Sequence, residues 1–139
     1  MTLSDLIVVS GGFDPIHVGH VRMIRAASAY APVAVVVNSD DWLMRKKGYV
    51  FMPFEERKEI IESIAGVQKV VAVDDQDNTV CEALRRLGPA MFGNGGDSTP
   101  GNTPEQDVCR ELGIRLVWNL GRGGKVQSSS ELVDRAGLK

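Results

Sequence analysis

Short runs of apolar residues alternate along the chain with segments whose apolar residues recur at helical spacing. Five of these runs are rich in β-branched or aromatic residues, which is typical of strands. The second run is apolar without interruption, as in strands that are covered on both faces of a parallel sheet. The pattern predicts strands at residues 6–9, 32–37, 69–73, 90–92 and 114–118.

Capping and turn residues mark the helices between these strands. Thr79–Glu82 resembles a capping box, in which side chains bind the first free N–H groups of a helix. Thr103–Gln106 has proline at the first helical position, where the missing N–H costs little. The predicted helices are residues 18–29, a segment after Pro53 that buries Ile60, Ile61 and Ile64, a segment ending at Gly88–Pro89, a segment from Thr103, and a last helix opened by Ser128–Glu131.

The alternation of strands and helices predicts one α/β domain over residues 1–139. We expect a Rossmann-like, five-stranded parallel sheet with helices on both faces. The length of 139 residues and the hydrophobic content of 43% match a single well-filled core. The same pattern would suit a flavodoxin-like or receiver domain, but a receiver needs acidic residues after its first strand. This chain has Ser10, Gly11 and Gly12 there.

Composition narrows the partners and the compartment. A net charge of −2 gives no basic field for DNA or RNA, so we expect no nucleic-acid partner. The first apolar run is short and no basic segment precedes it, so we expect no signal peptide, no membrane association and a cytoplasmic protein. Cys81 and Cys109 form no disulfide framework and are interpreted as structural thiols.

The segment 11–20 follows the first strand and contains both histidines of the chain. Helix starts at the carboxyl edge of a parallel sheet attract anions. His17 and His20 are three residues apart, so they lie on one face of the first helical turn. Gly11 and Gly12 would let the backbone approach a ligand closely. Two histidines fall short of the three or four ligands of a zinc site, so no metal ligand is predicted.

The segment Gly-Gly-Phe-Asp-Pro-Ile-His-Val-Gly-His resembles the phosphate-binding signature of the His-x-Gly-His nucleotidyltransferase superfamily. That superfamily includes glycerol-3-phosphate cytidylyltransferase and the adenylyltransferases of heptose phosphates and of pantetheine phosphate. Later segments of the chain fall in the family's order. The resemblance implies an enzyme that joins a nucleoside triphosphate to a small phosphorylated metabolite and releases pyrophosphate. It also implies Mg²⁺ bound with the triphosphate and a homodimer.

The resemblance assigns roles to the residues of this turn. His17 and His20 would be catalytic donors to the triphosphate, because in-line phosphoryl transfer depends on positioning and on donors aimed at developing charge. Protonation of one histidine would strengthen its donation. Asp14 is either a cap or turn residue or a substrate-side group. The nucleotide-binding residues predicted here are Ser10, Gly11, Gly12, Phe13, Asp14 and Gly19.

Basic residues follow the second predicted strand. Arg45, Lys46 and Lys47 are expected in a loop that could close over the triphosphate, although a solvated run of charges is the usual explanation. By resemblance Lys46 is assigned the catalytic role ahead of Lys47, which is assigned to nucleotide binding. Arg57 lies in a Glu-x-Arg helix start and either reaches the active site or is an exposed charge.

Two later segments complete the predicted site. A glycine-rich loop is expected after the fourth strand, where the backbone meets a ligand. A serine-rich helix start forms a second anion cradle, in which Ser128 is assigned a catalytic role by resemblance. The other nucleotide-binding residues predicted in these segments are Gly93, Asn94, Gly96, Asp97, Arg122, Ser129 and Ser130.

Three functions remain open from the sequence. The first is nucleotide transfer from CTP to a polyol or sugar phosphate, a function that the compactness of the chain slightly favours. The second is a heptose-phosphate type of adenylyltransferase using ATP, which Gly95–Asp97 resembles more closely. The third is a module that senses a nucleotide without turning it over.

Overall fold

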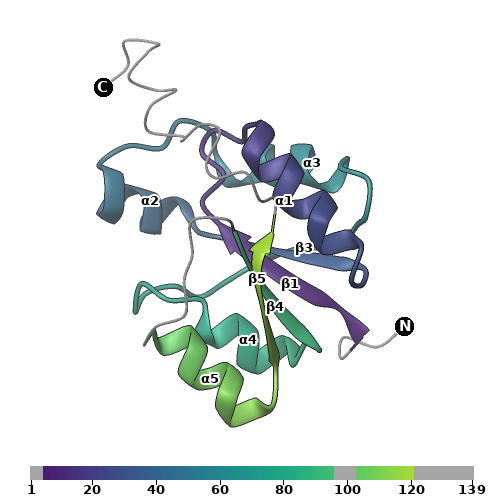
Figure 1. Cartoon of the computed structure of the whole chain (residues 1–139). Coiled ribbons are helices and arrows are strands. Elements are labelled where there is room, and N and C mark those ends of the chain that lie inside the picture. Colours follow the sequence, from purple (N-terminus) through teal and green to yellow (C-terminus); the bar gives the residue numbers. More distant parts are fainter. Residues whose placement is uncertain (1–4, 96–102, 121–139) are drawn as a thin grey trace.

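A computed structural model describes residues 5–95 and 103–120. They form a five-stranded sheet in the order β3-β2-β1-β4-β5, and every adjacent pair is parallel (Figure 1). This confirms the predicted parallel sheet. Its strands are β1 (Ile7–Gly11), β2 (Val33–Val37), β3 (Val67–Ala72), β4 (Met91–Gly95) and β5 (Arg115–Leu120).

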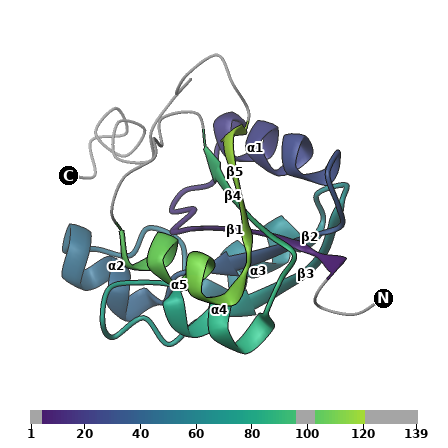
Figure 2. The ribbon, with the colours of Figure 1, turned by 60° about the horizontal axis from the view of Figure 1, so that its bottom comes forward.

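Helices cover both faces of the sheet, as predicted (Figures 1 and 2). On one face lie α1 (Val18–Ser28) and α3 (Phe54–Glu62), and on the other lie α4 (Cys81–Leu87) and α5 (Pro104–Leu112). Side chains alternate between the two cores along each strand. In β1, Ile7 and Val9 pack into the core under α1 and α3, whereas Val8 packs into the core under α4 and α5.

The order of the strands creates a switch point at the carboxyl end of β1. The chain builds β1, β2 and β3 towards one edge, then crosses back to place β4 on the other side of β1. Ligands of open α/β sheets bind at such a point. The segment with the two histidines begins there.

Three strands, β1, β4 and β5, end later than predicted. Ser10 and Gly11 are the last residues of β1, and Gly93–Gly95 belong to β4 instead of a loop. A Cβ added at Gly93 would lie 2.4 Å from Leu120 Cδ1, so packing against β5 explains this glycine. Ile61 is buried as predicted, but Ile60 is 38% exposed, and its assignment to the inner face of the helix is wrong.

The predicted basic loop is wrong, because Arg45–Lys47 form the last turn of a helix, α2 (Asp40–Lys47). Ser39 caps this helix by accepting a hydrogen bond from the N–H of Trp42, and Gly48 ends it at φ 83°. Acidic residues in the first turn and basic residues in the last turn both favour the helix macrodipole. Each of these signals was present in the sequence.

The predicted capping box at Thr79–Glu82 is also wrong. The hydroxyl of Thr79 accepts from the N–H of Cys81, but the Glu82 carboxylate accepts from the N–H of Asp74 and pairs with Arg86. The start of α5 agrees with prediction, since Thr103 accepts from the N–H of Gln106. The helix predicted from Ser128 lies outside the described residues. None of the helices described is long and apolar enough to cross a membrane.

Candidate active site

The two histidines close the start of α1 as a reciprocal pair. His17 is the N-cap residue, and its Nδ1 accepts from the N–H of Gly19 at 3.1 Å. His20 Nδ1 accepts from the N–H of His17, also at 3.1 Å. The rings stack with their centroids 3.8 Å apart. The prediction that both side chains share one face of the first turn is confirmed.

These hydrogen bonds decide where the ring protons lie. A nitrogen that accepts carries no proton, so each neutral imidazole holds its proton on Nε2. The pair therefore presents Nε2–H donors at the start of a helix, where the backbone also favours an anion. The protonated histidine considered from the sequence stays a prediction.

The protein itself fills the space above the glycine pair. A Cβ at Gly11 would lie 3.3 Å from the Phe13 ring, and one at Gly12 would lie 3.2 Å from Leu43 and 3.3 Å from Trp42. Phe13 is buried at φ 53°, and its ring contacts the edge of His20 at 4.8 Å between centroids. Internal packing thus accounts for both glycines, and their contact with a nucleotide stays a prediction.

Asp14 connects the histidine turn to the segment that follows α2 by hydrogen bonds. Its side chain is completely buried, and its carboxylate accepts from the N–H of Phe51 at 2.7 Å and from the N–H of Met52. It does not cap α1, because His17 does. Of the alternative of a cap or turn residue, the cap is therefore wrong, but Asp14 does lie in a turn, and its carboxylate has structural partners on a separate segment.

Arg57 binds the same region from α3, and the alternative of an exposed charge is wrong because its side chain is fully buried. Its Nε donates to the carbonyl of Met52 at 2.9 Å, and Nη1 donates to the carbonyls of Gly12 at 2.7 Å and Asn38 at 2.8 Å. Nη2 forms an ion pair with Asp40 at 2.6 Å. One guanidinium thus ties the exits of β1 and β2 to the start of α2.

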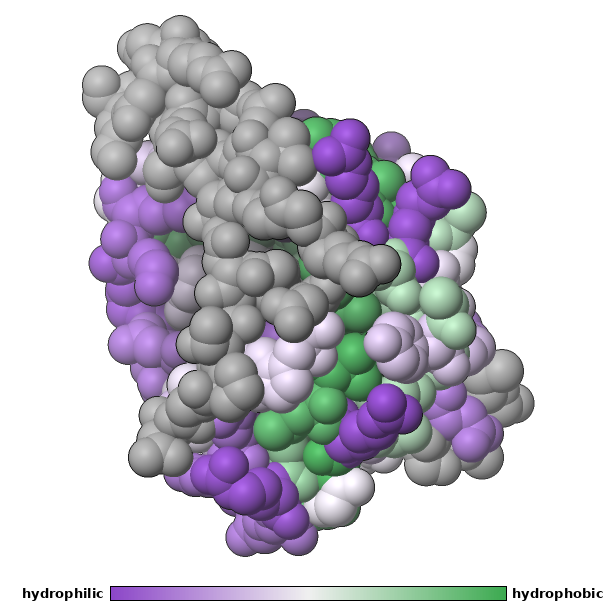
Figure 3. Space-filling model, in the orientation of Figure 1, coloured by the Kyte–Doolittle hydropathy of each residue, from purple (hydrophilic) through white to green (hydrophobic). Residues whose placement is uncertain are grey.

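The basic end of α2 lies near the histidine turn, and hydrophilic side chains cover this helix (Figure 3). Lys47 Nζ donates to the backbone carbonyl of Asp14 at 3.3 Å. Lys46 lies 5.4 Å over the Trp42 ring and lines a hollow of about 370 Å³ with Arg45 and Asn78. Of the two lysines, the structure places Lys47 at the turn, whereas the sequence favoured Lys46.

Asp75 is a residue that the sequence analysis missed. It is 3% exposed, and its carboxylate accepts from Asn38 Nδ2 at 3.1 Å and from the N–H and hydroxyl of Ser39 at 2.8 and 2.7 Å. Arg45 donates to its backbone carbonyl at 2.7 Å. Asp75 therefore fixes the start of α2. Its place after the third strand, at the same sheet edge as the first turn, was the available signal.

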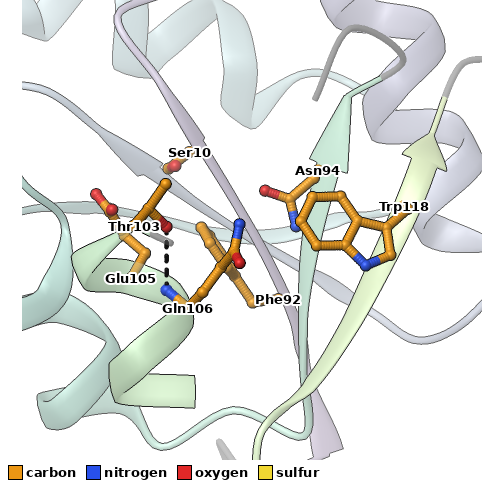
Figure 4. A pocket seen from close by; sticks show the side chains of 7 residues that line it. All are labelled: Ser10, Phe92, Asn94, Thr103, Glu105, Gln106 and Trp118. Atoms are coloured by element: carbon orange, nitrogen blue, oxygen red, sulfur yellow. Dashed lines mark hydrogen bonds between the residues drawn. The ribbon is translucent and has the colours of Figure 1, made fainter. Parts of the chain in front are cut away.

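A second hollow opens at the same sheet edge, on the face covered by α4 and α5 (Figure 4). Its volume is about 340 Å³. Ser10 and Asn94, both predicted to bind nucleotide, lie here and not beside the histidines. The other residues that line it are Phe92, Thr103, Glu105, Gln106 and Trp118, none of which the sequence analysis assigned to the site.

The remaining predicted residues lie outside the described part of the chain and stay predictions. They are Gly96, Asp97, Arg122, Ser128, Ser129 and Ser130. Within residues 5–95 and 103–120, no three His, Cys, Asp or Glu side chains gather in a way that could hold a metal ion.

Comparison with known proteins shows the family of the chain. Residues 8–119 match the cytidylyltransferase-like family, and the chain belongs to that family of nucleotidyltransferases. It is 32% identical over 133 residues to the bifunctional protein HldE of Geobacter metallireducens, covering 94% of this chain and 26% of that protein. The chain therefore spans about a quarter of the length of that relative.

One further relative and one solved structure can be compared with the chain. The FAD synthase of Ferroglobus placidus is 26% identical, with 78% of this chain and 70% of that protein covered. The crystal structure of a lipopolysaccharide core biosynthesis protein from Thermoplasma volcanium superposes with a TM-score of 0.66 at 20% identity, covering 82% of this chain and 93% of that one. The structural likeness supports the fold.

Proposed function

We propose that this chain transfers a nucleoside monophosphate, with ATP as the favoured donor, to the phosphate of a small sugar or polyol phosphate. Pyrophosphate is the second product. The observation that carries this proposal is the reciprocal pair of hydrogen bonds in which Nδ1 of His17 and Nδ1 of His20 accept, because a neutral ring bound in this way carries its proton on Nε2. They lie at the switch point of a parallel sheet, where a phosphate-bearing ligand is expected.

The proposed step is an in-line displacement at the α-phosphorus. An oxygen of the acceptor phosphate forms the new P–O bond while the bond to pyrophosphate breaks. His17 and His20 donate from Nε2 to the oxygens on which negative charge grows, and the ammonium of Lys47 or Lys46 offsets that charge. No covalent enzyme intermediate is needed.

Mg²⁺ is proposed to arrive with the triphosphate. The carboxylate within the histidine turn, that of Asp14, is buried and accepts two backbone N–H groups, so it suits a structural role better than a metal ligand. Ions of this kind are commonly held by triphosphate oxygens and water. The ion would neutralise charge on the triphosphate.

The relatives support the choice of donor and acceptor. FAD contains adenosine, and a relative named FAD synthase matches most of this chain. The HldE relative matches 94% of this chain. This match is in keeping with the heptose-phosphate type of adenylyltransferase that Gly95–Asp97 resembles. The name of the matching family favours CTP as a second candidate donor.

The test is pyrophosphate release. The protein is incubated with Mg²⁺, with ATP or CTP, and with glycerol 3-phosphate or hexose and heptose phosphates as acceptors. We expect release that needs both an acceptor and a triphosphate, and that is faster with ATP. Tight binding of ATP, measured by thermal shift, without release for any acceptor would support the sensing module instead. Light scattering in the same samples tests the predicted homodimer.

A further inference from the structure

The hollow beside α2 has no role in the proposed reaction. In both ribbon views α2 lies at the rim of the molecule, apart from the helices that cover the two faces of the sheet (Figures 1 and 2). The hollow has a volume of about 370 Å³ and is lined by Trp42, Arg45, Lys46 and Asn78. Among the described residues that line it there is no histidine, and Lys47 contacts the histidine turn instead.

Arg45 and Asn78 are held in place and still have donors to offer. Nε of Arg45 donates to Oδ1 of Asn78 at 3.2 Å, and its Nη2 donates to the carbonyl of Asp75 at 2.7 Å. Within the described residues, Nη1 of Arg45 has no acceptor. Because Arg45 occupies the oxygen of the Asn78 amide, the NH₂ group of that amide is the part left for a ligand. The two side chains therefore form a fixed pair of donors.

Lys46 adds a positive charge to these donors. Its Nζ lies 5.4 Å from the centroid of the Trp42 ring, and no oxygen of the described residues accepts a hydrogen bond from it. The carboxylate of Asp77, next to Asn78 in the chain, accepts from the N–H and the hydroxyl of Thr79 instead. The end of α2 carries a partial negative charge of about half a unit, which the charges of Lys46 and Arg45 outweigh.

An anion with several oxygens matches this lining. An ammonium, a guanidinium and an amide NH₂ all donate, and the oxygens of a phosphate group accept from several donors at once. The ring of Trp42 adds an apolar wall, which suits an organic group attached to the phosphate. The volume of about 370 Å³ is within the range of small-molecule sites.

We infer that the hollow lined by Trp42, Arg45, Lys46 and Asn78 binds the phosphate group of a small anion. This site is separate from the histidine turn, and the inference does not rest on the proposed function. The phosphate is either free or part of an organic molecule. Trp42 also meets the turn, because its Cζ3 would lie 3.3 Å from a Cβ added at Gly12. The test must therefore distinguish an anion in the hollow from an anion at the turn.

Fluorescence of Trp42 reports on the hollow. The chain has two tryptophans, so Trp118→Phe leaves Trp42 as the sole reporter. This variant is titrated with sodium phosphate and with phenyl phosphate at constant ionic strength. We expect a saturable change in emission, because a bound phosphate group draws the Lys46 ammonium away from the ring. Tighter binding of phenyl phosphate would identify an organic phosphate as the ligand, and equal binding would identify free phosphate. No saturable response to either anion would overturn the inference.

Asn78→Asp tests the donors of the hollow. It keeps an oxygen for Arg45 but replaces the NH₂ donor by a negative oxygen, and aspartate tolerates the φ of 65° at this position. We expect the Kd for phosphate to rise at least about tenfold. The matched control is Gln76→Glu, which adds the same charge in the same loop at an exposed residue that does not line the hollow. Its Kd should stay within about twofold of the parent value. An unchanged Kd in Asn78→Asp would contradict the site.

Two further titrations separate the hollow from the turn. His17→Asn and the addition of saturating ATP should each leave the Kd for phosphate within about twofold. Loss of phosphate binding in either titration would show that the anion occupies the histidine turn, and would refute a separate site. Isothermal titration calorimetry of the chain without Trp118→Phe repeats both comparisons, so the result does not depend on that substitution.

Discussion

The two halves of the carboxyl edge are built in opposite ways. In the histidine half, the buried polar groups bind one another: Asp14 holds two backbone N–H groups, and Arg57 holds three carbonyls and Asp40. In the α5 half, polar side chains line an open hollow (Figure 4). The first half is organised before any ligand arrives, which is what electrostatic catalysis requires. In the second half, Glu105 accepts from the N–H of Val80 and Asn94 donates to the carbonyl of Val117, yet a hollow of about 340 Å³ stays open beside them.

The contrast is tested most strongly at Arg57. Arg57→Met should lower the free energy of unfolding by about 3–5 kcal/mol, because it leaves three carbonyls and Asp40 without their buried partner. The measurement is urea denaturation followed by circular dichroism. The control in the α5 half is Arg85→Met, whose ion pair with Glu111 is more than half exposed and should contribute less than about 1 kcal/mol. Equal losses in the two variants would contradict the contrast.

His17 has two roles that can be separated. Asparagine is a good N-cap residue, so His17→Asn should keep the start of α1 intact while removing the Nε2–H donor. We expect pyrophosphate release to fall by about 100- to 1,000-fold with little change in Tm. His17→Ala should lose the cap as well as the turnover. The control is Arg22→Ala, an exposed position on the same helix. A rate for His17→Asn within about tenfold of the parent would rule out the catalytic role.

A substitution at Asp14 tests the same comparison between the two halves, with a smaller expected loss of stability than at Arg57. Asp14→Asn keeps the shape of the side chain but faces an amide NH₂ towards one of the N–H groups of Phe51 and Met52. We expect a loss of about 1–3 kcal/mol in the free energy of unfolding. The proposed role predicts that hydrogen exchange at Phe51 and Met52 speeds up before exchange in β1 does. Unaltered exchange at those two amides would show that the hydrogen bonds to Asp14 do not stabilise this segment.

The smallest effect is expected at the thiols of the α4 and α5 half. Burial raises the pKa of Cys109 to about 11, and it also raises the pKa of Cys81 above its usual 9.0. The pKa of the Cys109 thiol is higher in the folded protein than in the unfolded chain. The contribution of the neutral thiol to the free energy of unfolding is therefore fully present below pH 9 and is lost as pH rises through about 11. Iodoacetamide at pH 8 should alkylate Cys109 only after unfolding. Comparison with Cys109→Ala isolates the part of the pH-dependent stability that comes from this thiol. Rapid alkylation of Cys109 in the native protein would contradict its burial.

Local sequence patterns predicted most of the fold because the strands are short, apolar and separated by recognisable caps. The sheet, the cap at Thr103 and the common face of His17 and His20 all follow from spacing that involves neighbouring residues only. The helix α2 was also readable, from Ser39 at its start and Gly48 at its end.

Contacts between distant segments could not be predicted in this way. The burial of Arg57 depends on the meeting of three carbonyls from three separate segments, whereas its own neighbours, Glu55, Glu56 and Lys58, look like an exposed helix. The hollow beside α5 draws on β1, β4, α5 and β5 and has no local motif. Sequence spacing therefore identified the turn with the two histidines and missed this hollow.

The ring of His17 fills the space above Gly19, which has a consequence for any attempt to transplant this turn into another scaffold. A methyl group there would lie 2.9 Å from Cε1 of His17, inside the volume that the imidazole occupies. The glycine is thus a steric condition for the orientation of its neighbour and not a flexible joint. Grafting the two histidines onto another helix start would not be sufficient, because the functional unit is a pair of rings together with the side chain that is absent between them.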